Sequence, residues 1–327
     1  MRTARGLFAR LCSREHLELA AQAMVRGKRR SPAVAWFLFR REELLARLAD
    51  ALAAGTWEPE GFDLLLLRDP KPRVIARAPV IDRVVHQAIV SLLEPVFAPS
   101  LLPMDYACRA GLGTHRALLA LQRAMRAHRF VVHLDIRAYF PSIHLGILRD
   151  IIAQRVRDDA MLAVVDRVLS AGAGLIDGPE MRSWLHLSDD WPPRGRGLPI
   201  GAHTSQFWAA HVYLLALDYT IKRSLRVPSA VRYVDDIFLF GDSRAALRGW
   251  RAAVGAWLGA ERDARLKHPN ARILSCAGHL DALGCRVTRD EIRRLPVGLR
   301  RLWAGLFSCG ATAANARIPA LAGAILL

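Results

Sequence analysis

The sequence contains few cysteines, and none of them is arranged as a metal-binding pair. Five cysteines occur among 327 residues, at positions 12, 108, 276, 285 and 309. No two of them form a CxxC motif, which argues against a zinc site and against a disulfide framework. A chain with this cysteine usage fits a reducing cytoplasm.

Long apolar runs are absent from both ends of the chain. The N-terminal stretch MRTARGLFARLCSREH is charged and has no apolar core, so it does not predict a secretory signal peptide. The stretch 318–327 is an apolar run of about ten residues, which is too short to span a bilayer. We therefore expect no membrane insertion, and we expect the C-terminal stretch to pack on the body or on a partner.

Acidic residues are scarce relative to basic ones. Lys and Arg total 47 against 30 Asp and Glu, which gives a net charge of +17. This arginine-dominated excess predicts a polyanionic partner, with nucleic acid as the first candidate. GC-rich coding that inflates arginine is the alternative, and composition does not separate RNA from DNA or acidic lipid. The apolar fraction of 52% is enough for a packed core and excludes global disorder.

The apolar pattern predicts seven helical stretches. They cover residues 13–25, 42–55, 81–95, 114–128, 144–171, 204 or 205 to 225, and 243–260. We expect Ser13 and Thr114 to cap two of these helices at their N-termini. Gly55 and Pro95 are expected to end two others.

Strands are predicted where apolar residues are continuous or bounded by turn residues. The stretch 62–80 predicts two strands around a basic, Pro-rich turn. FVVHLDI at 130–136 predicts a strand buried on both faces. SAVRYVDDIFLF at 229–240 predicts a hairpin with its turn at two adjacent aspartates, and two short strands are expected within 264–289. This order predicts an α+β fold in which helices back an antiparallel sheet.

Three aspartates stand out because they interrupt or end apolar strands. Asp135 follows the buried strand, and Asp235 and Asp236 lie at the predicted hairpin tip. Alone, an Asp-Asp pair is typical of a turn, and Asp135 is typical of a helix cap or a strand end. If the hairpin pairs beside the first strand, the three carboxylates meet and repel one another unless cations neutralise them. Mg²⁺ is the cation that such an oxygen-rich cluster predicts.

The motifs around these aspartates resemble those of the reverse transcriptase family. DIRAYF (135–140) resembles its first metal-binding motif, YVDD (233–236) its palm hairpin, and GLPIGAHTSQ (197–206) the motif between them. KPRVIARAPVIDRVVHQAI (71–89) resembles the fingers region, and MDYACRAGLGTHRAL (104–118) the segment leading into the palm. The resemblance implies RNA-directed DNA polymerase activity and a right-hand polymerase fold with fingers, palm and a short helical thumb.

The resemblance also implies a division of the chain into four parts. These are an N-terminal helical extension at 1–60, fingers at 61–130, a palm with fingers insertions at 131–290, and a short or abbreviated thumb at 291–327. No endonuclease, integrase or RNase H segment is expected in the remaining length.

The resemblance assigns a metal site and a nucleotide site. Asp135 and Asp235 are implied metal ligands, Asp236 assists or orients them, and the backbone carbonyl of Ile136 is a further ligand. Two Mg²⁺ ions, or Mn²⁺ in their place, would activate a 3′-hydroxyl and stabilise the leaving pyrophosphate. The implied nucleotide-binding residues are Lys71, Arg73, Tyr139, Phe140, Ile200, Gly201 and Gln206.

Individual roles follow from the same resemblance. Lys71 and Arg73 match the fingers cations that hold a triphosphate, and Arg77 is a weaker candidate. Phe140 matches a bulky ring that leaves no room for a ribose 2′-hydroxyl and so selects deoxynucleotides. Without the family context, Phe140 is equally typical of a core aromatic, and the cations are typical of an ordinary basic loop.

Two dipeptides bear on the subtype. Ile200-Gly201 and Ser205-Gln206 resemble the reverse transcriptases of diversity-generating retroelements, which copy a template RNA with frequent errors at adenines. Partners implied are template RNA, primer or cDNA, dNTPs and a small basic accessory protein. The alternatives are another bacterial reverse transcriptase of the retron, intron or phage-defence type, or a non-catalytic RNA-binding protein with a polymerase fold.

The sequence departs from the family pattern after the hairpin. Relatives carry a lysine within an LHP stretch, whereas LKHPNAR places Ala271 near that position with Lys267 upstream. The aromatic-Leu-Gly of the primer-contacting hairpin is ALG at 282–284. A general-acid lysine is therefore not assigned from the resemblance.

Overall fold

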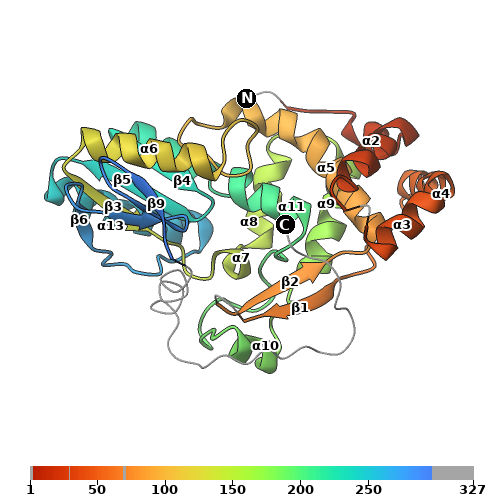
Figure 1. Ribbon diagram of the computed structural model, residues 1–327. Helices are drawn as coiled ribbons and strands as arrows, with labels where there is room; N and C mark the ends of the chain where they lie inside the picture. The colour runs from red at the N-terminus through yellow and green to blue at the C-terminus, as the bar shows by residue number, and fades with distance from the viewer. Residues whose placement is uncertain (1–2, 29, 69–70, 297–327) are drawn as a thin grey trace.

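The computed structural model describes residues 3–28, 30–68 and 71–296. N-terminal helices gather at one end, a helix-covered sheet lies at the other, and a two-stranded ribbon projects between them (Figure 1). Most of the predicted thumb, residues 297–327, lies outside the described residues. The predicted division into helical extension, fingers and palm stays a prediction.

The central sheet has four antiparallel strands in the order β4-β5-β3-β6. They are β3 (Phe130–Leu134), β4 (Ser229–Tyr233), β5 (Asp236–Gly241) and β6 (Ile273–Ser275). β3 lies between β5 and β6, and its residues Val131 and Val132 are fully buried. The prediction of a strand buried on both faces is confirmed, and so is the hairpin with its turn at the two aspartates.

Helices cover both faces of this sheet. α6 (Thr114–Ala127) packs on the face that carries Val131 and Phe240. α13 (Arg244–Arg262) packs on the other face, against β3 and β5, where Val132 and Leu239 point. Successive apolar residues of one strand therefore supply two cores, as the two-residue period of a strand dictates.

Two smaller sheets complete the strands. β1 (Asp63–Leu67) and β2 (Arg73–Arg77) form the antiparallel ribbon predicted for 62–80. β7 (Leu280–Ala282), β8 (Cys285–Val287) and β9 (Ile292–Arg294) form a three-stranded sheet. Residues 264–289 therefore hold three strands, β6 to β8, where two were predicted.

The N-terminal helices follow the predicted caps. They are α1 (Leu7–Leu11), α2 (Arg14–Met24), α3 (Pro32–Phe39) and α4 (Arg41–Ala53). The Ser13 hydroxyl accepts the His16 N–H at the start of α2, and Gly55 has a φ of 67° just beyond α4. Both predictions are confirmed, while α1 and α3 were not predicted.

Pro95 does not end its helix, so that prediction is wrong. α5 runs from Val80 to Phe97 and continues into a 3₁₀ turn, Ala98–Ser100. Proline inside a helix removes one hydrogen bond. Phe97 lies just beyond it, is fully buried, and packs edge-to-face on Phe207 at 6.2 Å. Burial of this ring outweighs the lost bond.

Thr114 does not cap α6, which corrects a second prediction. The cap position is Gly113, and Thr114 is the first helical residue. The Thr114 hydroxyl instead forms a hydrogen bond of 3.0 Å with the hydroxyl of Tyr233 on the hairpin. The Thr114 hydroxyl thus bonds to a residue distant in sequence instead of to a backbone N–H in the first turn of α6.

The predicted helix over 144–171 is two helices. α8 (Leu145–Ala153) and α9 (Asp159–Gly172) are separated by a turn, and the side chain of Asp158 accepts the Met161 N–H as the cap of α9. Two short helices, α7 (Tyr139–Ser142) and α10 (Pro179–Trp184), lie in the flanking segments. The remainder of 172–200 is loop, as predicted.

The helix predicted to begin at Thr204 or Ser205 begins at His203. It comprises α11 (His203–Phe207), a π-helical turn (Trp208–Val212), α12 (Leu215–Tyr219) and a second π-helical turn (Thr220–Ser224). The Thr204 hydroxyl does not cap, because it bonds to Nδ1 of buried His86 at 2.8 Å. Within the described ranges, no helix is both long and apolar enough to cross a membrane.

Asp82, in the first turn of α5, gives a test of this packing. Asp82 is only 2% exposed, and burial raises the pKa of its carboxyl to about 6. Between pH 4 and 6 the folded protein keeps this proton while the unfolded chain releases it, so stability falls as pH rises through that window. Asp82→Asn should add about 1–2 kcal/mol to the unfolding free energy above pH 6.

Urea unfolding of wild type and variant from pH 4 to 8 measures this effect. The difference between the two proteins isolates Asp82, and Asp50→Asn, on an exposed position of α4, is the control. A difference that is the same at pH 4 and pH 8 contradicts the assignment.

Candidate functional site

A cavity of about 710 Å³ lies where the ribbon, the end of β3 and the hairpin tip meet. Nine of the predicted site residues line it: Lys71, Arg73, Asp135, Ile136, Tyr139, Phe140, Ile200, Asp235 and Asp236. These residues come from positions up to 165 apart in the chain (71 to 236). Gly201 and Gln206, also predicted, do not line it.

Strand register brings the three carboxylates together. Leu134 pairs with Ile237 across β3 and β5, so Asp135 follows immediately beside Asp236. Tyr233 pairs with Asp236 across β4 and β5, which leaves Val234 and Asp235 as a two-residue turn. All three aspartates therefore face one cavity from one end of the sheet.

The hairpin turn has an unusual backbone. Val234 has a φ of 57°, in the left-handed region that a β-branched residue rarely occupies. A positive φ at the first turn residue is typical of a tight hairpin in which glycine is usually found. The tip that presents Asp235 is thus held in a conformation that its own sequence disfavours.

Asp235 is the most perturbed carboxyl of the site. Burial, reinforced by the neighbouring charges of Asp236 and Asp135, raises its pKa to about 7, and Lys71 offsets only part of this. The protein alone compensates a carboxylate in this position only in part. The arrangement favours an added cation.

The other two carboxylates have protein partners. Lys267 Nζ lies 3.1 Å from Asp135 Oδ2, and its backbone N–H donates to the Asp135 carbonyl at 2.8 Å. His133 Nε2 lies 2.6 Å from Asp236 Oδ1, with the imidazole stacked on Phe238 at 4.3 Å. The Asp135 and Asp236 side chains are thus oriented by neighbours on the sheet.

The fit to a divalent cation rests on donor chemistry. Carboxylate and carbonyl oxygens suit a hard ion, and the charge on Asp235 is compensated only in part. In the part of the chain that is described, no group of three His, Cys, Asp or Glu side chains is placed so that it could hold a metal ion. The predicted metal ligands share a cavity, and the metal site itself stays a prediction.

Three cations, Lys71, Arg73 and Lys267, line the cavity together with the carboxylates. Burial, with the nearby charges of Arg73 and Lys267, lowers the pKa of Lys71. Like charges held this close favour an anion between them. Arg77, the weaker candidate, instead pairs with Asp63 across the ribbon at 3.0 Å.

The two aromatic candidates differ in placement. Phe140 lines the cavity and is half-buried. Tyr139 is 3% exposed, its hydroxyl donates to the Ala209 carbonyl at 2.6 Å, and its ring meets Phe140 edge-to-face at 5.8 Å. Tyr139 therefore supports the Phe140 ring from behind, and its hydroxyl is already used inside the protein.

Gly201 and Gln206 have structural contacts instead. Gly201 has a φ of 115°, and a Cβ there would lie 2.8 Å from the Ala76 carbonyl oxygen. The adjacent Ile200 carbonyl accepts the Ala76 N–H at 2.7 Å, so this segment is laid directly against the ribbon. Gln206 Nε2 donates to Cys108 Sγ at 3.0 Å. The predicted nucleotide contacts of these two residues stay predictions.

One wall of the cavity was missed by the sequence analysis. Residues 185–188 and Trp191, from the loop after α10, line it. Arg137 donates to the Ser188 hydroxyl at 2.7 Å, and Trp191 Nε1 donates to the Arg137 carbonyl at 3.2 Å. This loop is thereby fixed to the segment that follows Asp135. In the sequence, the only indication of this wall is Trp191, a large aromatic residue within a polar loop.

Comparisons with known proteins agree with this architecture. No family model matches the chain. The group II intron-encoded protein LtrA of Lactococcus lactis subsp. cremoris is 23% identical over 134 residues, 40% of this chain and 22% of LtrA. Apo telomerase from Candida tropicalis, truncated from its C-terminal domain, superposes with a TM-score of 0.50 at 10% identity over 72% of this chain. Telomerase from Candida albicans, in complex with a telomeric RNA fragment, gives 0.53 at 9% identity over 74%.

The chain spans about half the length of these telomerases, 55% and 47% respectively. At such identities the structural likeness shows the fold alone, and that fold is the predicted right-hand polymerase fold. Together with the LtrA match, it supports the reverse transcriptase family.

Proposed function

We propose that this protein is an RNA-directed DNA polymerase. The observation that carries the proposal is one cavity with three carboxylates at its sheet end and a cation pair on the facing ribbon. Carboxylates suit the metal ions, and cations suit the triphosphate, of nucleotidyl transfer. The similarity to LtrA and the net charge of +17 add to it.

In the proposed reaction the primer 3′-oxygen bonds to the α-phosphorus of a dNTP. The bond from that phosphorus to the bridging oxygen breaks, pyrophosphate leaves, and the hydroxyl proton passes to solvent. Asp135, Asp235 and the Ile136 carbonyl would hold Mg²⁺ or Mn²⁺, with Asp236 orienting. When bound, these ions supply Lewis acidity to the attacking and leaving oxygens.

The remaining residues bind and orient. Lys71 and Arg73 hold the triphosphate, and the Phe140 ring lies against the sugar. Lys267 keeps the Asp135 carboxylate in place in the absence of metal. Template RNA and primer occupy the basic surface around the cavity, where phosphate contacts dominate affinity.

Primer extension on an RNA template with all four dNTPs tests the proposal. Extension with Mg²⁺ or Mn²⁺ supports it. RNA binding without extension in either metal would instead favour a non-catalytic RNA-binding protein with the polymerase fold.

Within this activity we infer error-prone copying of the diversity-generating type. Ile200 lines the cavity and its apolar side chain cannot donate the hydrogen bonds of a glutamine. Looser positioning of template and nucleotide lowers the difference in transition-state stabilisation between correct and incorrect pairs. A small basic accessory protein as partner remains a prediction of this subtype.

Replacement of Ile200 by Gln should reduce misincorporation opposite template adenine about fivefold, because one added hydrogen bond is worth about 1 kcal/mol. Ile200→Met is the matched control, because a methionine side chain is as long as that of glutamine but has no hydrogen-bond donor. This variant should keep the parental error rate. Sequencing of cDNA from a defined RNA template measures both. An unchanged error spectrum in Ile200→Gln contradicts the inference.

An intron-type reverse transcriptase is the second candidate, because part of the chain is similar in sequence to the group II intron-encoded protein LtrA. The genomic neighbourhood separates the two. A template and variable repeat pair with adenine-specific mismatches supports the first candidate, and flanking intron RNA domains support the second.

A further inference from the structure

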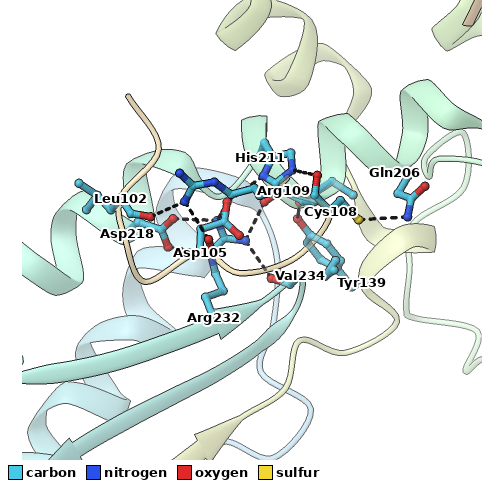
Figure 2. Close-up of polar contacts among 12 residues, drawn as sticks. Leu102, Asp105, Cys108, Arg109, Tyr139, Gln206, His211, Asp218, Arg232 and Val234 are labelled. Atoms are coloured by element: carbon cyan, nitrogen blue, oxygen red, sulfur yellow. Dashed lines mark hydrogen bonds and ion pairs between the residues drawn. The ribbon is translucent and has the colours of Figure 1, made fainter. Parts of the chain in front are cut away.

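A fully buried group of charges lies directly beneath the hairpin. It consists of Arg232, the last residue but one of β4, with Asp105, Asp218 and His211 (Figure 2). Arg232, Asp105 and Asp218 are 0% exposed, and His211 is 3% exposed. None of these residues lines the cavity, and the proposed reaction does not use them.

Arg232 makes four hydrogen bonds through its guanidinium and a further ion pair. Nε and one terminal nitrogen donate to the two oxygens of Asp218, each at 2.7 Å, as a bidentate pair. The same terminal nitrogen lies 3.0 Å from Asp105 Oδ2. The other terminal nitrogen donates to the carbonyls of Ala210, at 2.7 Å, and Val234, at 3.1 Å. A planar guanidinium held by four hydrogen bonds and a second ion pair has one orientation only.

These contacts join three separate parts of the chain. Asp105 lies on the segment before α6, which also pairs with β4, because Arg232 N–H donates to the Met104 carbonyl and Tyr106 N–H to the Arg232 carbonyl. Asp218 lies on α12, and His211, which bonds to Asp105 at 2.8 Å, lies in the π-helical turn before it. The Arg232 guanidinium thereby connects β4 to the segment before α6 and to α12.

The contact to Val234 links this group to the site. Val234 is the left-handed residue of the turn, and it directly precedes Asp235. A non-glycine residue in that region costs of order 1–3 kcal/mol and persists only where its surroundings impose it. The Arg232 bond to the Val234 carbonyl, two residues further along the chain, is such an imposed contact.

Stability alone is a poor explanation for this group. Buried ion pairs are often no more stable than apolar side chains of similar volume, because desolvation offsets their attraction. A guanidinium fixed by these contacts does provide orientation, and one of its hydrogen bonds goes to the Val234 carbonyl at the hairpin tip.

We infer that Arg232, held by Asp218 and Asp105, is a positioning residue that fixes the Val234–Asp235 turn so that the Asp235 carboxylate enters the cavity. The kinetic consequence of this inference rests on the proposed polymerase function. The structural consequence, an ordered tip, does not.

Arg232→Lys tests the inference, because lysine keeps the charge and loses the planar fork. Arg262→Lys is the matched control, since Arg262, the last residue of α13, is also buried but donates to the carbonyls of Tyr213 and Glu261 instead of to the Val234 carbonyl. Asp218→Asn is a milder second variant, which keeps the shape and removes one charge, should Arg232→Lys fold poorly.

Hydrogen exchange measured by mass spectrometry reports the backbone order of the hairpin tip and does not require polymerase activity. Peptides covering 230–240 should exchange about tenfold faster in Arg232→Lys and in Asp218→Asn, and at the wild-type rate in Arg262→Lys. In primer extension, kcat should fall about 10- to 100-fold with KM for dNTP changed less than about threefold, as expected for a misplaced catalytic group.

The two measurements separate the possible failures. If the peptides covering 230–240 exchange at the wild-type rate in both Arg232→Lys and Asp218→Asn, the inference is overturned, whatever the polymerase activity of these variants. Equal losses of kcat in Arg232→Lys and Arg262→Lys also overturn it, because they would report general loosening. Faster tip exchange in Arg232→Lys and Asp218→Asn, together with a wild type that extends no primer, would uphold the positioning and contradict only the polymerase function.

Discussion

Asp235→Asn is expected to lower dNTP incorporation by about 10³-fold or more. In the proposed reaction Asp235 would hold a metal ion, so its loss would remove several kcal/mol of transition-state stabilisation, and each 1.36 kcal/mol is about tenfold in rate. Single-turnover primer extension on an RNA template measures it. Because asparagine has nearly the same shape, the loss reports the charge of the side chain.

The same substitution should stabilise the fold. In the absence of metal, burial and the charges of Asp236 and Asp135 raise the pKa of Asp235 to about 7, so its ionised form destabilises the native state above that pH. Its stability contribution falls as pH rises from about 4 to 7, and Asp235→Asn removes this dependence. We expect about 2 kcal/mol of added stability at pH 8 in EDTA.

Asp242→Asn is the control for both arms. Asp242 lies just past the other end of β5, is exposed, and accepts the Arg129 N–H at 2.9 Å. It should leave incorporation within about twofold and give no gain in stability. Polymerisation by Asp235→Asn at the wild-type rate would contradict the proposed role, and a loss of stability would contradict the charge-crowding argument.

Asp235 is expected to support activity and to lower stability. This opposition explains why the sequence alone could mark the hairpin tip as a candidate site. Two aspartates in an apolar run violate the pattern of a stable hairpin, and such violations are expected at functional sites. Local signals were also sufficient for Ser13, Gly55 and the β1–β2 ribbon, where cap, turn and alternation all act within a few residues.

Predictions failed where a distant partner replaced a local one. Thr114 bonds to Tyr233, 119 positions away, and Pro95 is tolerated because Phe97 reaches the core. The same limit applies to the site. Lys267 reaches Asp135 across 132 positions, and the loop at 185–188 is held by Arg137, and neither contact has a local sequence signal.

The Lys267 contact also bears on the departure from the family pattern. Ala271, near the position where a lysine was expected, packs against the core, whereas Lys267 lines the cavity. Its ammonium lies with Lys71 and Arg73 in one charged environment around the carboxylates. These three cations and the three carboxylates come from four separate segments of the chain, and Arg137 and Arg196 line the cavity as well.

Phe140→Val should reduce the preference for dNTP over rNTP about 10²-fold. The ring lines the cavity and is held from behind by Tyr139, so it cannot retreat from a nucleotide sugar without disturbing a buried side chain. Valine removes most of the ring and opens room for a 2′-hydroxyl. Exclusion of a single hydroxyl by shape alone is worth about 10² in specificity, which sets the size of the effect.

The ratio of kcat/KM for each dNTP and its rNTP counterpart measures this preference. Most of the change should come from faster ribonucleotide incorporation, with dNTP incorporation lowered only modestly. Phe8→Val, a half-buried ring on α1 that packs against the core and does not line the cavity, controls for loss of packing. An unchanged ratio in Phe140→Val would mean that the ring is a core aromatic and that sugar selection lies elsewhere in the cavity.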